Sequence, residues 1–300
     1  MWKTKRTCTF RSRWAEGRTA WLFLAPSLAG TAVFVLLPFL DVVRRSFTEP
    51  VGGGLVGLEN FRQVLENKAF RLAMKNTLRF MVCCIPLLMG VSLLTALFVR
   101  GAADKSGLFK TTLLLPMAIP VASVVYLWKL VFHPLGLLNQ LPWLAAGTRV
   151  DYMGQQSAFY VLVFTYIWKN NGYDMILWLA GLDGIAGELY EAAQVDGAGA
   201  WQKFRYITAP GLKGTAFLAA VLSVMNSFKV FREAYLISGD YPHESIYMLQ
   251  HLLNNWFVSM DIQKMSAASV LLEGGVLSLV GLWCGWRGWK RSRYRGKEGA

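Results

Sequence analysis

Six blocks of about twenty or more largely apolar residues recur along the 300-residue chain, separated by more polar segments. They lie near 20–43, 78–99, 111–132, 158–182, 214–238 and 266–286. A helix of about 20 residues can cross roughly 30 Å of hydrocarbon. The pattern therefore predicts an all-α polytopic membrane protein with six transmembrane helices. Kinks are expected at the prolines inside the blocks, which are Pro26, Pro38, Pro86, Pro116 and Pro120.

The first block follows a basic leader, as the core of a secretion signal would. It continues to about Val43, which is too long for a signal core, and no small-residue cleavage site precedes the next polar stretch. We therefore interpret it as a retained anchor. The expected organisation is a basic cytoplasmic N-terminus (1–19), a six-helix transmembrane domain (20–286) and a basic cytoplasmic C-terminus (287–300).

The distribution of Lys and Arg predicts the orientation of these spans. With both termini in the cytoplasm, 18 of the 31 basic residues fall in inside segments, 8 in outside segments and 5 within spans. Basic residues favour the cytoplasmic side of a bilayer. We therefore expect a multi-pass protein of the cytoplasmic or inner membrane, embedded in lipid, with both termini in the cytoplasm.

Composition excludes several other classes of protein. The chain is 54% hydrophobic and only 16% charged, an apolar excess above that of soluble domains. Its net charge of +13 is spread over the termini and the segments between apolar blocks, without a nucleic-acid-binding module, so no nucleic-acid partner is expected. The four cysteines have no metal-ligand spacing and form no framework of paired loops.

The segment between the fourth and fifth blocks, GELYEAAQVDGAGAWQKFRYITAP (187–210), should face the cytoplasm. Apolar residues recur in it at helical spacing, first at 189, 192 and 193 and then at 201, 204 and 207, which predicts two short helices. Gly197 and Gly199 can adopt positive φ in the turn between them, and Pro210 is expected to end the second helix.

Such a helix pair could lie on lipid headgroups. The first helix, however, offers Glu188, Glu191 and Asp196 with no Lys or Arg, which is a poor face for an anionic lipid surface. Its small alanines suit insertion into a groove of a protein partner.

Several stretches resemble the permease subunits of binding-protein-dependent ABC importers of the maltose/lactose type. The segment ELYEAAQVDGAGAWQKFRYITAP (188–210) resembles their cytoplasmic EAA loop, and WKNNGYDMILWLAGL (168–182) resembles the stretch that leads into it. VGLENF (56–61) and LLLPMAIPVASVVYLWKLVFHPLGLLN (113–139) also resemble this family. The resemblance covers nearly the whole chain.

The resemblance implies a permease that forms half of a pathway for a sugar or oligosaccharide. Its partners would be a second homologous permease subunit, a dimer of ATP-binding cassette ATPases and an extracytoplasmic solute-binding protein. The coupling residues that it implies are Glu188, Glu191, Ala192, Ala193, Asp196 and Gly197. Among these, Glu191 would contact the ATPase, the alanines would permit close approach and Gly197 would allow the turn.

Other functions remain as alternatives. An importer of the same kind could carry another small polar solute, such as a polyol or glycerol-phosphate. A self-sufficient secondary transporter usually shows an internal repeat with paired broken helices, which the chain lacks. A membrane-embedded enzyme would need a catalytic constellation, and none is apparent.

No catalytic or cofactor chemistry is indicated by the motifs. The phosphate-binding pattern GxxxxGK[ST] does not occur, so ATP hydrolysis is expected in a separate subunit. The histidines lack HExxH spacing and no GxSxG is present. We expect no catalytic residue, metal or cofactor, and the chain is not predicted to be an enzyme.

Polar residues within the fifth block are candidates for a translocation pathway. Leu222, Asn226, Lys229 and Glu233 follow one helical stripe, with Lys229 and Glu233 one turn apart. Ionisable groups at membrane depth usually face the bundle interior or a water-filled path. Alternatively, Lys229 and Arg232 could reach outward to the interface while Glu233 merely pairs with them.

The fourth block contains a polar stretch from Trp168 to Asp174, WKNNGYD. A broken helix that lines a cavity would explain it. Aromatic rings suit the C–H faces of a sugar and amides suit its hydroxyls, so Trp168 and Asn171 join the pathway candidates. Helix packing or an interfacial belt is the alternative for both.

Overall fold

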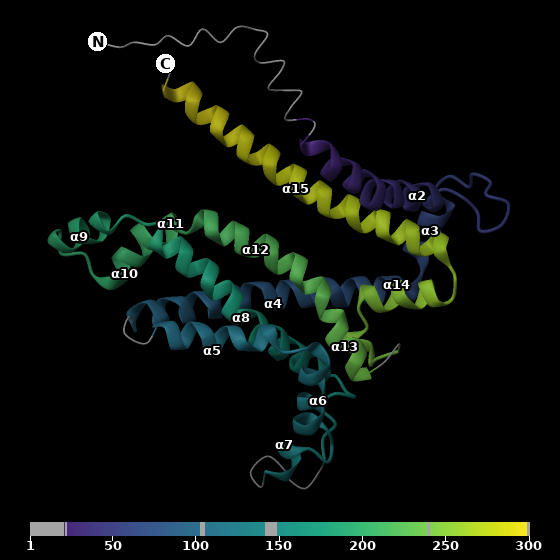
Figure 1. Ribbon diagram of the computed structural model, residues 1–300, viewed down its shortest axis with the longest axis horizontal. Coiled ribbons are helices and arrows are strands. Elements are labelled where there is room, and N and C mark those ends of the chain that lie inside the picture. Colours follow the sequence, from purple (N-terminus) through teal and green to yellow (C-terminus); the bar gives the residue numbers. More distant parts are fainter. Residues whose placement is uncertain (1–20, 22, 103–105, 142–148, 239–240, 299–300) are drawn as a thin grey trace. The chain divides into compact units, whose positions relative to one another are not determined.

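A computed structural model describes residues 21, 23–102, 106–141, 149–238 and 241–298. Within these residues the regular structure is helical, apart from an isolated antiparallel bridge between Thr48 and Leu55. The all-α prediction is therefore confirmed for this part of the chain (Figure 1). Contacts divide the chain into two units, Met1–Asn67 with Trp256–Ala300 and Lys68–Asn255.

In the first unit, α15 (Ile262–Glu298) packs against α2 (Leu37–Ser46) and α3 (Glu59–Glu66). A π turn, η1 (Ala32–Leu36), lies directly before Pro38 near the start of α2. Proline has no N–H and its ring collides with the carbonyl four residues earlier, and a wider turn relieves both problems. The irregularity expected at Pro38 therefore takes the form of a π turn.

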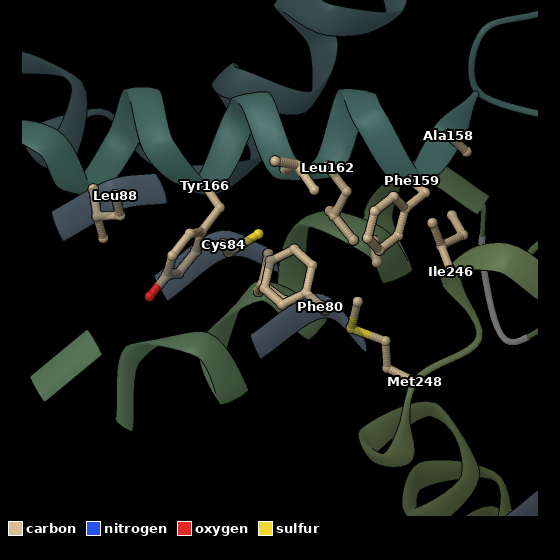
Figure 2. Close-up of a cluster of buried hydrophobic side chains, with 12 residues drawn as sticks. Phe80, Cys84, Leu88, Ala158, Phe159, Leu162, Tyr166, Ile246 and Met248 are labelled. Atoms are coloured by element: carbon tan, nitrogen blue, oxygen red, sulfur yellow. The ribbon is translucent and has the colours of Figure 1, made fainter. Parts of the chain in front are cut away.

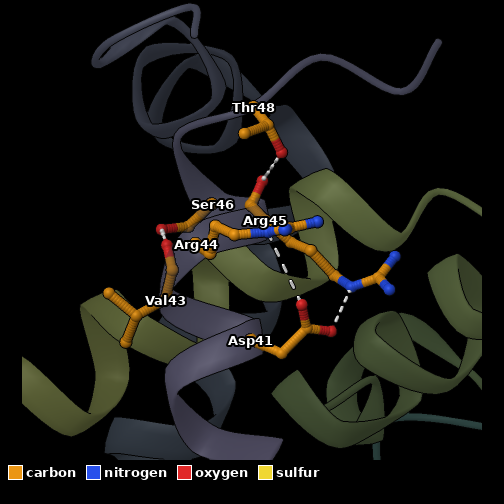
Figure 3. A network of polar contacts seen from close by, with 6 residues as sticks. All are labelled: Asp41, Val43, Arg44, Arg45, Ser46 and Thr48. Atoms are coloured by element: carbon orange, nitrogen blue, oxygen red, sulfur yellow. Dashed lines mark hydrogen bonds and ion pairs between the residues drawn. The ribbon is translucent and has the colours of Figure 1, made fainter. Parts of the chain in front are cut away.

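Polar contacts stabilise the end of α2 and the segment that follows it. Asp41 accepts a hydrogen bond from Arg45 Nε one turn later (2.6 Å) in the network of Figure 3. Asn60 of α3 is buried, and its Nδ2 donates to the carbonyls of Ser46 and Thr48 at 3.0 Å each. These bonds satisfy carbonyls that have no helical partner at the end of α2.

In the second unit, α8 (Ala158–Asp183) packs against α4 (Lys68–Gly101), α5 (Ser106–Ala118) and α12 (Lys213–Ser227). Next to this group, α13 (Phe231–Ser238) packs on α6 (Val121–Phe132), which α7 (Leu137–Gln140) follows. Figure 1 shows α8 between α4, α5 and α12. η5 (Glu244–Ile246) also contacts α8, and α14 (Leu249–Val258) leads into the first unit.

Aromatic contacts and hydrogen bonds hold α4 and α8 together. Phe80 meets Tyr166 and Phe159 edge to face, with centroids 5.4 and 6.4 Å apart (Figure 2). Farther along, Trp178 Nε1 donates to Ser92 Oγ at 2.9 Å. Lipid tails are as apolar as the side chains, so packing and hydrogen bonds of this kind, more than the hydrophobic effect, join helices within a bilayer.

Among the residues that the structure describes, four helical stretches are long and apolar enough to cross a membrane: Phe23–Ser46, Lys68–Gly101, Val121–Gln140 and Lys213–Leu236. They coincide with, or overlap, the first, second, third and fifth predicted spans. The third predicted span, 111–132, is interrupted at Ile119 and Pro120, between α5 and α6. A kink was expected at Pro120, and the structure has a full break there.

The fourth predicted span corresponds to α8, which is continuous. The expectation of a broken helix at 168–174 is therefore wrong. An α-helix tolerates these polar residues because each of its faces meets a different neighbour. One of those faces requires Gly172, where an added Cβ would collide with the carbonyl oxygen of Leu113 in α5.

Candidate functional site

The predicted pair of short helices is present between α8 and α12. α9 (Gly187–Val195) is followed by a turn and then by α10 (Ala200–Lys203), η3 (Phe204–Thr208, a π turn) and α11 (Ala209–Gly211). We call residues 187–211 the helix pair. Gly197 has φ +75°, as the sequence predicted for the turn, whereas Gly199 has an ordinary φ of −68° and is the N-cap of α10. The N–H of Gly199 donates to Gln202 Oε1 at 2.8 Å.

Pro210 does not end the second helix, contrary to expectation. The N–H of Ala209 donates to the carbonyl of Phe204, five residues earlier, and this wider turn accommodates the proline that follows. Only Leu212 then separates α11 from α12. The second arm of the helix pair is therefore joined almost directly to a long helix of the bundle.

Few contacts tie the helix pair to its surroundings. Tyr190 and Thr208 share a hydrogen bond between hydroxyls (2.9 Å), which joins the two arms. Arg100, at the end of α4, lies over the Tyr190 ring at 5.8 Å. Neither α9 nor α10 contains a buried residue, and Trp201 is 72% exposed although it stacks on Phe204. Large apolar side chains exposed together on one segment, here Leu189, Val195 and Trp201, are typical of a docking site.

The predicted coupling residues gather on this surface. Glu188, Glu191, Ala192 and Ala193 lie on α9, Asp196 directly follows it, and Gly197 forms the turn. All are exposed except Ala193, which is half-buried. Within the described residues the three carboxylates make no ion pair, so their charge is available to a partner.

A polar pocket of about 420 Å³ lies within the second unit. Three segments form it: the break between α5 and α6, one face of α8, and the region where α12 passes through a 3₁₀ turn, η4 (Phe228–Val230), into α13. Its lining residues are Met117, Ala118, Ile119, Pro120, Val121, Tyr166, Lys169, Asn170, Asn226, Lys229, Val230, Arg232 and Glu233. Apolar groups from the helix break thus face charged and amide groups.

A buried ion pair crosses the pocket wall. Lys169 Nζ of α8 lies 2.7 Å from Glu233 Oε1 of α13, and the two side chains are 15% and 7% exposed. Lys229 instead donates to Asn226 Oδ1 at 2.9 Å. The alternative in which Glu233 pairs with its neighbours Lys229 and Arg232 is therefore wrong, because the carboxylate points across to α8.

Of the predicted pathway residues, Asn226, Lys229 and Glu233 lie together at the pocket. Trp168 and Asn171 are not among its lining residues. Trp168 packs edge to face on Trp128, with centroids 5.3 Å apart. Asn171 Oδ1 accepts a hydrogen bond from Thr95 Oγ1 of α4 at 3.3 Å. Both therefore make helix-packing contacts, which was the alternative considered for them.

Several lining residues were not among the predicted site residues. Tyr166 precedes Lys169 by three residues and Asn170 by four, spacings that place it on the same face of α8 as each of them. The wall from Met117 to Val121 depends on the break before α6, and Pro116 with Pro120 was its only local signal. Within the described residues, no group of His, Cys, Asp or Glu could hold a metal ion.

Starting at Tyr166, which lines the pocket, buried hydrogen bonds join α8 to α12. Tyr166 OH donates to the carbonyl of Ser223 (2.8 Å), and Ser223 Oγ donates to Asp174 Oδ2 (3.0 Å). The two bonds give the buried Tyr166 hydroxyl and Ser223 Oγ hydrogen-bond partners inside the bundle. The pocket therefore rests on a fixed α8–α12 contact.

Comparison with known proteins gives consistent matches. A family model described as "Binding-protein-dependent transport system inner membrane component" matches residues 89–282. The trehalose/maltose transport system permease protein of Thermococcus litoralis is 29% identical over 276 residues, which cover 90% of this chain and 94% of the relative. The lactose transport system permease protein of Rhizobium radiobacter is 30% identical, with 72% and 74% covered.

The fold also matches a solved structure. A chain from a bacterial alginate ABC transporter, in complex with an alginate pentasaccharide-bound periplasmic protein, aligns with a TM-score of 0.76. The alignment covers 90% of this chain and 94% of that chain, at 22% identity. At this identity the likeness concerns the fold.

Proposed function

Because the chain belongs to the family of inner membrane components of binding-protein-dependent transport systems, we propose that it forms half of the translocation pathway of an ABC importer for a sugar or oligosaccharide. It is a multi-pass membrane protein and a transport permease. The saccharide assignment is carried by the relatives, which are named for transport of trehalose/maltose and of lactose. Hydroxyl-rich ligands also suit a pocket that combines amide, charged and apolar groups.

We infer that six spans cross the membrane, with both termini and the helix pair in the cytoplasm. The excess of basic residues in the segments assigned to the inside supports this orientation. In this arrangement α5 and α6 together form the third span around the break at Pro120, and α15 contains the sixth. The N-terminal segment 1–19 lies outside the described residues.

The helix pair is proposed to dock on a separate ATPase subunit, through Glu188, Glu191, Ala192, Ala193, Asp196 and Gly197. Its exposed apolar side chains support this role, as do its carboxylates, which form no ion pair with a described residue. The near-continuous connection to α12, which ends at the pocket, offers a route by which movement of the docked pair reaches the pathway. A second homologous permease and an extracytoplasmic solute-binding protein complete the proposed assembly.

Copurification tests this proposal. The chain, expressed with a candidate ATPase and second permease, should retain the ATPase in stoichiometric amount and import a saccharide only with ATP and a binding protein. Glu191→Lys should remove ATPase retention and uptake while membrane insertion persists, whereas Glu244→Lys, on the segment assigned to the outside, should leave ATPase retention unchanged. Uptake by the lone chain would contradict the proposal.

A further inference from the structure

The pocket lining contains more positive than negative charge. Three cations and one carboxylate line it: Lys169, Lys229, Arg232 and Glu233. Lys169 and Glu233 neutralise each other across 2.7 Å. Lys229 and Arg232 are exposed and make no ion pair with any described residue, so two positive charges remain for a ligand.

The two remaining cations differ in what they can recognise. Arg232 carries a planar guanidinium whose parallel N–H groups match the two oxygens of a carboxylate. Lys229 adds a compact charge one turn earlier, oriented by Asn226 Oδ1 at 2.9 Å. Unneutralised charges at membrane depth are unfavourable, and an anionic ligand removes part of that penalty.

The same wall contains a buried hydrogen-bond acceptor, Glu233 Oε2, that suits a hydroxyl donor. Glu233 is only 5% exposed, and its Oε2 has no hydrogen-bond partner among the described residues, while its Oε1 accepts from Lys169. A buried acceptor without a donor is costly. The apolar wall from Met117 to Val121 provides a surface for the C–H face of a ring.

We propose that this pocket selects an acidic saccharide, in which a carboxylate meets Arg232 and Lys229 and a neighbouring hydroxyl donates to Glu233 Oε2. The inference rests on the proposed importer function and narrows its substrate class. A neutral sugar would leave both cations unpaired. An anion without hydroxyls would leave Glu233 Oε2 unsatisfied and would meet its negative charge at close range.

Equilibrium binding to the detergent-purified permease–ATPase complex tests the inference, with digalacturonate and the corresponding neutral digalactoside as probes. The wild-type complex should bind the acidic dimer at least about tenfold more tightly, and Arg232→Gln and Lys229→Gln should each weaken that binding about tenfold. Binding of the neutral dimer should change less than about twofold in either variant. Lys213→Gln, which removes an exposed charge from the same span outside the pocket, should leave both affinities unchanged.

Equal affinity for the two dimers, or unchanged acidic binding in Arg232→Gln, would overturn the inference. Tighter binding of glycerol 3-phosphate than of digalacturonate would also overturn it, in favour of a phosphate ester. If Arg232→Gln fails to assemble, Arg232→Lys should keep the preference for the acidic dimer at reduced affinity. Failure of the importer proposal is distinguishable, because it would remove the ATPase from the purified complex, whereas failure of the charge selection would not.

Discussion

The helix pair and the polar pocket lie in the same unit but are built in different ways. The helix pair comes from one stretch of 25 residues, 187–211, and its shape follows from a positive-φ glycine and two side-chain hydrogen bonds between its arms, Tyr190 with Thr208 and Lys203 with Gln194. The pocket draws residues from 117 to 233 and depends on an ion pair between helices. The first is locally determined and exposed, whereas the second exists only when the bundle is assembled.

This difference predicts different consequences of mutation. A substitution on the exposed surface of the helix pair should affect partner binding with little change in folding. A substitution at the pocket should often affect both, because its charged groups are also packing contacts between α8 and α13. Measuring stability and transport separately therefore distinguishes the two regions.

The largest effect is expected for the ion pair between Lys169 and Glu233. Glu233→Gln should lower the free energy of unfolding of the purified complex by about 3–5 kcal/mol, since it leaves a buried ammonium without its counter-charge. Lys169→Met should be similar, and the double variant should regain part of the loss in a double-mutant cycle. Denaturant unfolding in detergent provides the measurement.

Lys229→Met is the matched control, because Lys229 is exposed and lies one turn from Glu233 on the same span. It should change the free energy of unfolding by less than about 0.5 kcal/mol. If Lys229→Met were as harmful as Lys169→Met and also cancelled the effect of Glu233→Gln, the partner of Glu233 would be Lys229. That result would make the pocket a locally determined feature, like the helix pair.

The helix pair and the pocket also differ in how far they could be predicted from the sequence. The two short helices and the positive φ at Gly197 could be predicted because helical periodicity and glycine are local signals. The partner of Glu233 could not, since Lys229 and Lys169 are both reachable in principle and only the packing of α8 against the bundle decides between them. The polar stretch 168–174 suggested a broken helix because the sequence does not reveal that its residues face different neighbours.

The helical character of most of the predicted spans could also be predicted, because runs of about twenty apolar residues are a strong signal. The position of the break in the third span could not. Pro86 and Pro120 both lie within apolar blocks, yet α4 continues through Pro86 while the helix ends before Pro120. Neighbouring groups decide whether a freed carbonyl is satisfied, and these come from distant parts of the chain.

The next largest effect is expected at the turn of the helix pair. Gly197→Ala should destabilise the turn by about 1–2 kcal/mol, because an L-residue is unfavourable at φ +75°. The open space around this position means that the cost comes from the backbone alone. ATPase retention should fall roughly tenfold, as measured by titration of the detergent-purified permease with the ATPase.

Gly187→Ala is the control for this prediction. Gly187 begins α9, has no positive φ and also has open space for a Cβ, so alanine should be neutral or slightly stabilising there. Equal loss of ATPase binding in both variants would show that the turn conformation is unimportant. Loss of overall stability in Gly197→Ala would show that the helix pair contributes to the fold of the bundle.

A smaller effect is expected at Asn226. Asn226→Leu keeps a similar volume but removes the acceptor that orients Lys229, so uptake should fall severalfold, corresponding to about 0.5–1.5 kcal/mol. Yield of the complex and stimulation of its ATPase by the binding protein should stay near normal. Unchanged uptake, together with an Asn226→Cys thiol that water-soluble reagents cannot reach, would reject a pathway role for this position.

The smallest effect is expected for the hydrogen bond between Tyr190 and Thr208. Tyr190→Phe removes only the hydroxyl and keeps the ring beneath Arg100, so the two arms of the helix pair should separate more easily by about 0.5–1 kcal/mol. Hydrogen exchange of the α9 amides should accelerate about two- to fivefold, while exchange in α8 stays unchanged. Tyr206→Phe is the control, because that side chain is 75% exposed and its hydroxyl makes no hydrogen bond to a described residue. Equal acceleration in both variants would mean that the Tyr190–Thr208 bond does not hold the arms together, and the shape of the helix pair would then depend on the Gly197 turn and on the hydrogen bond from Lys203 to Gln194.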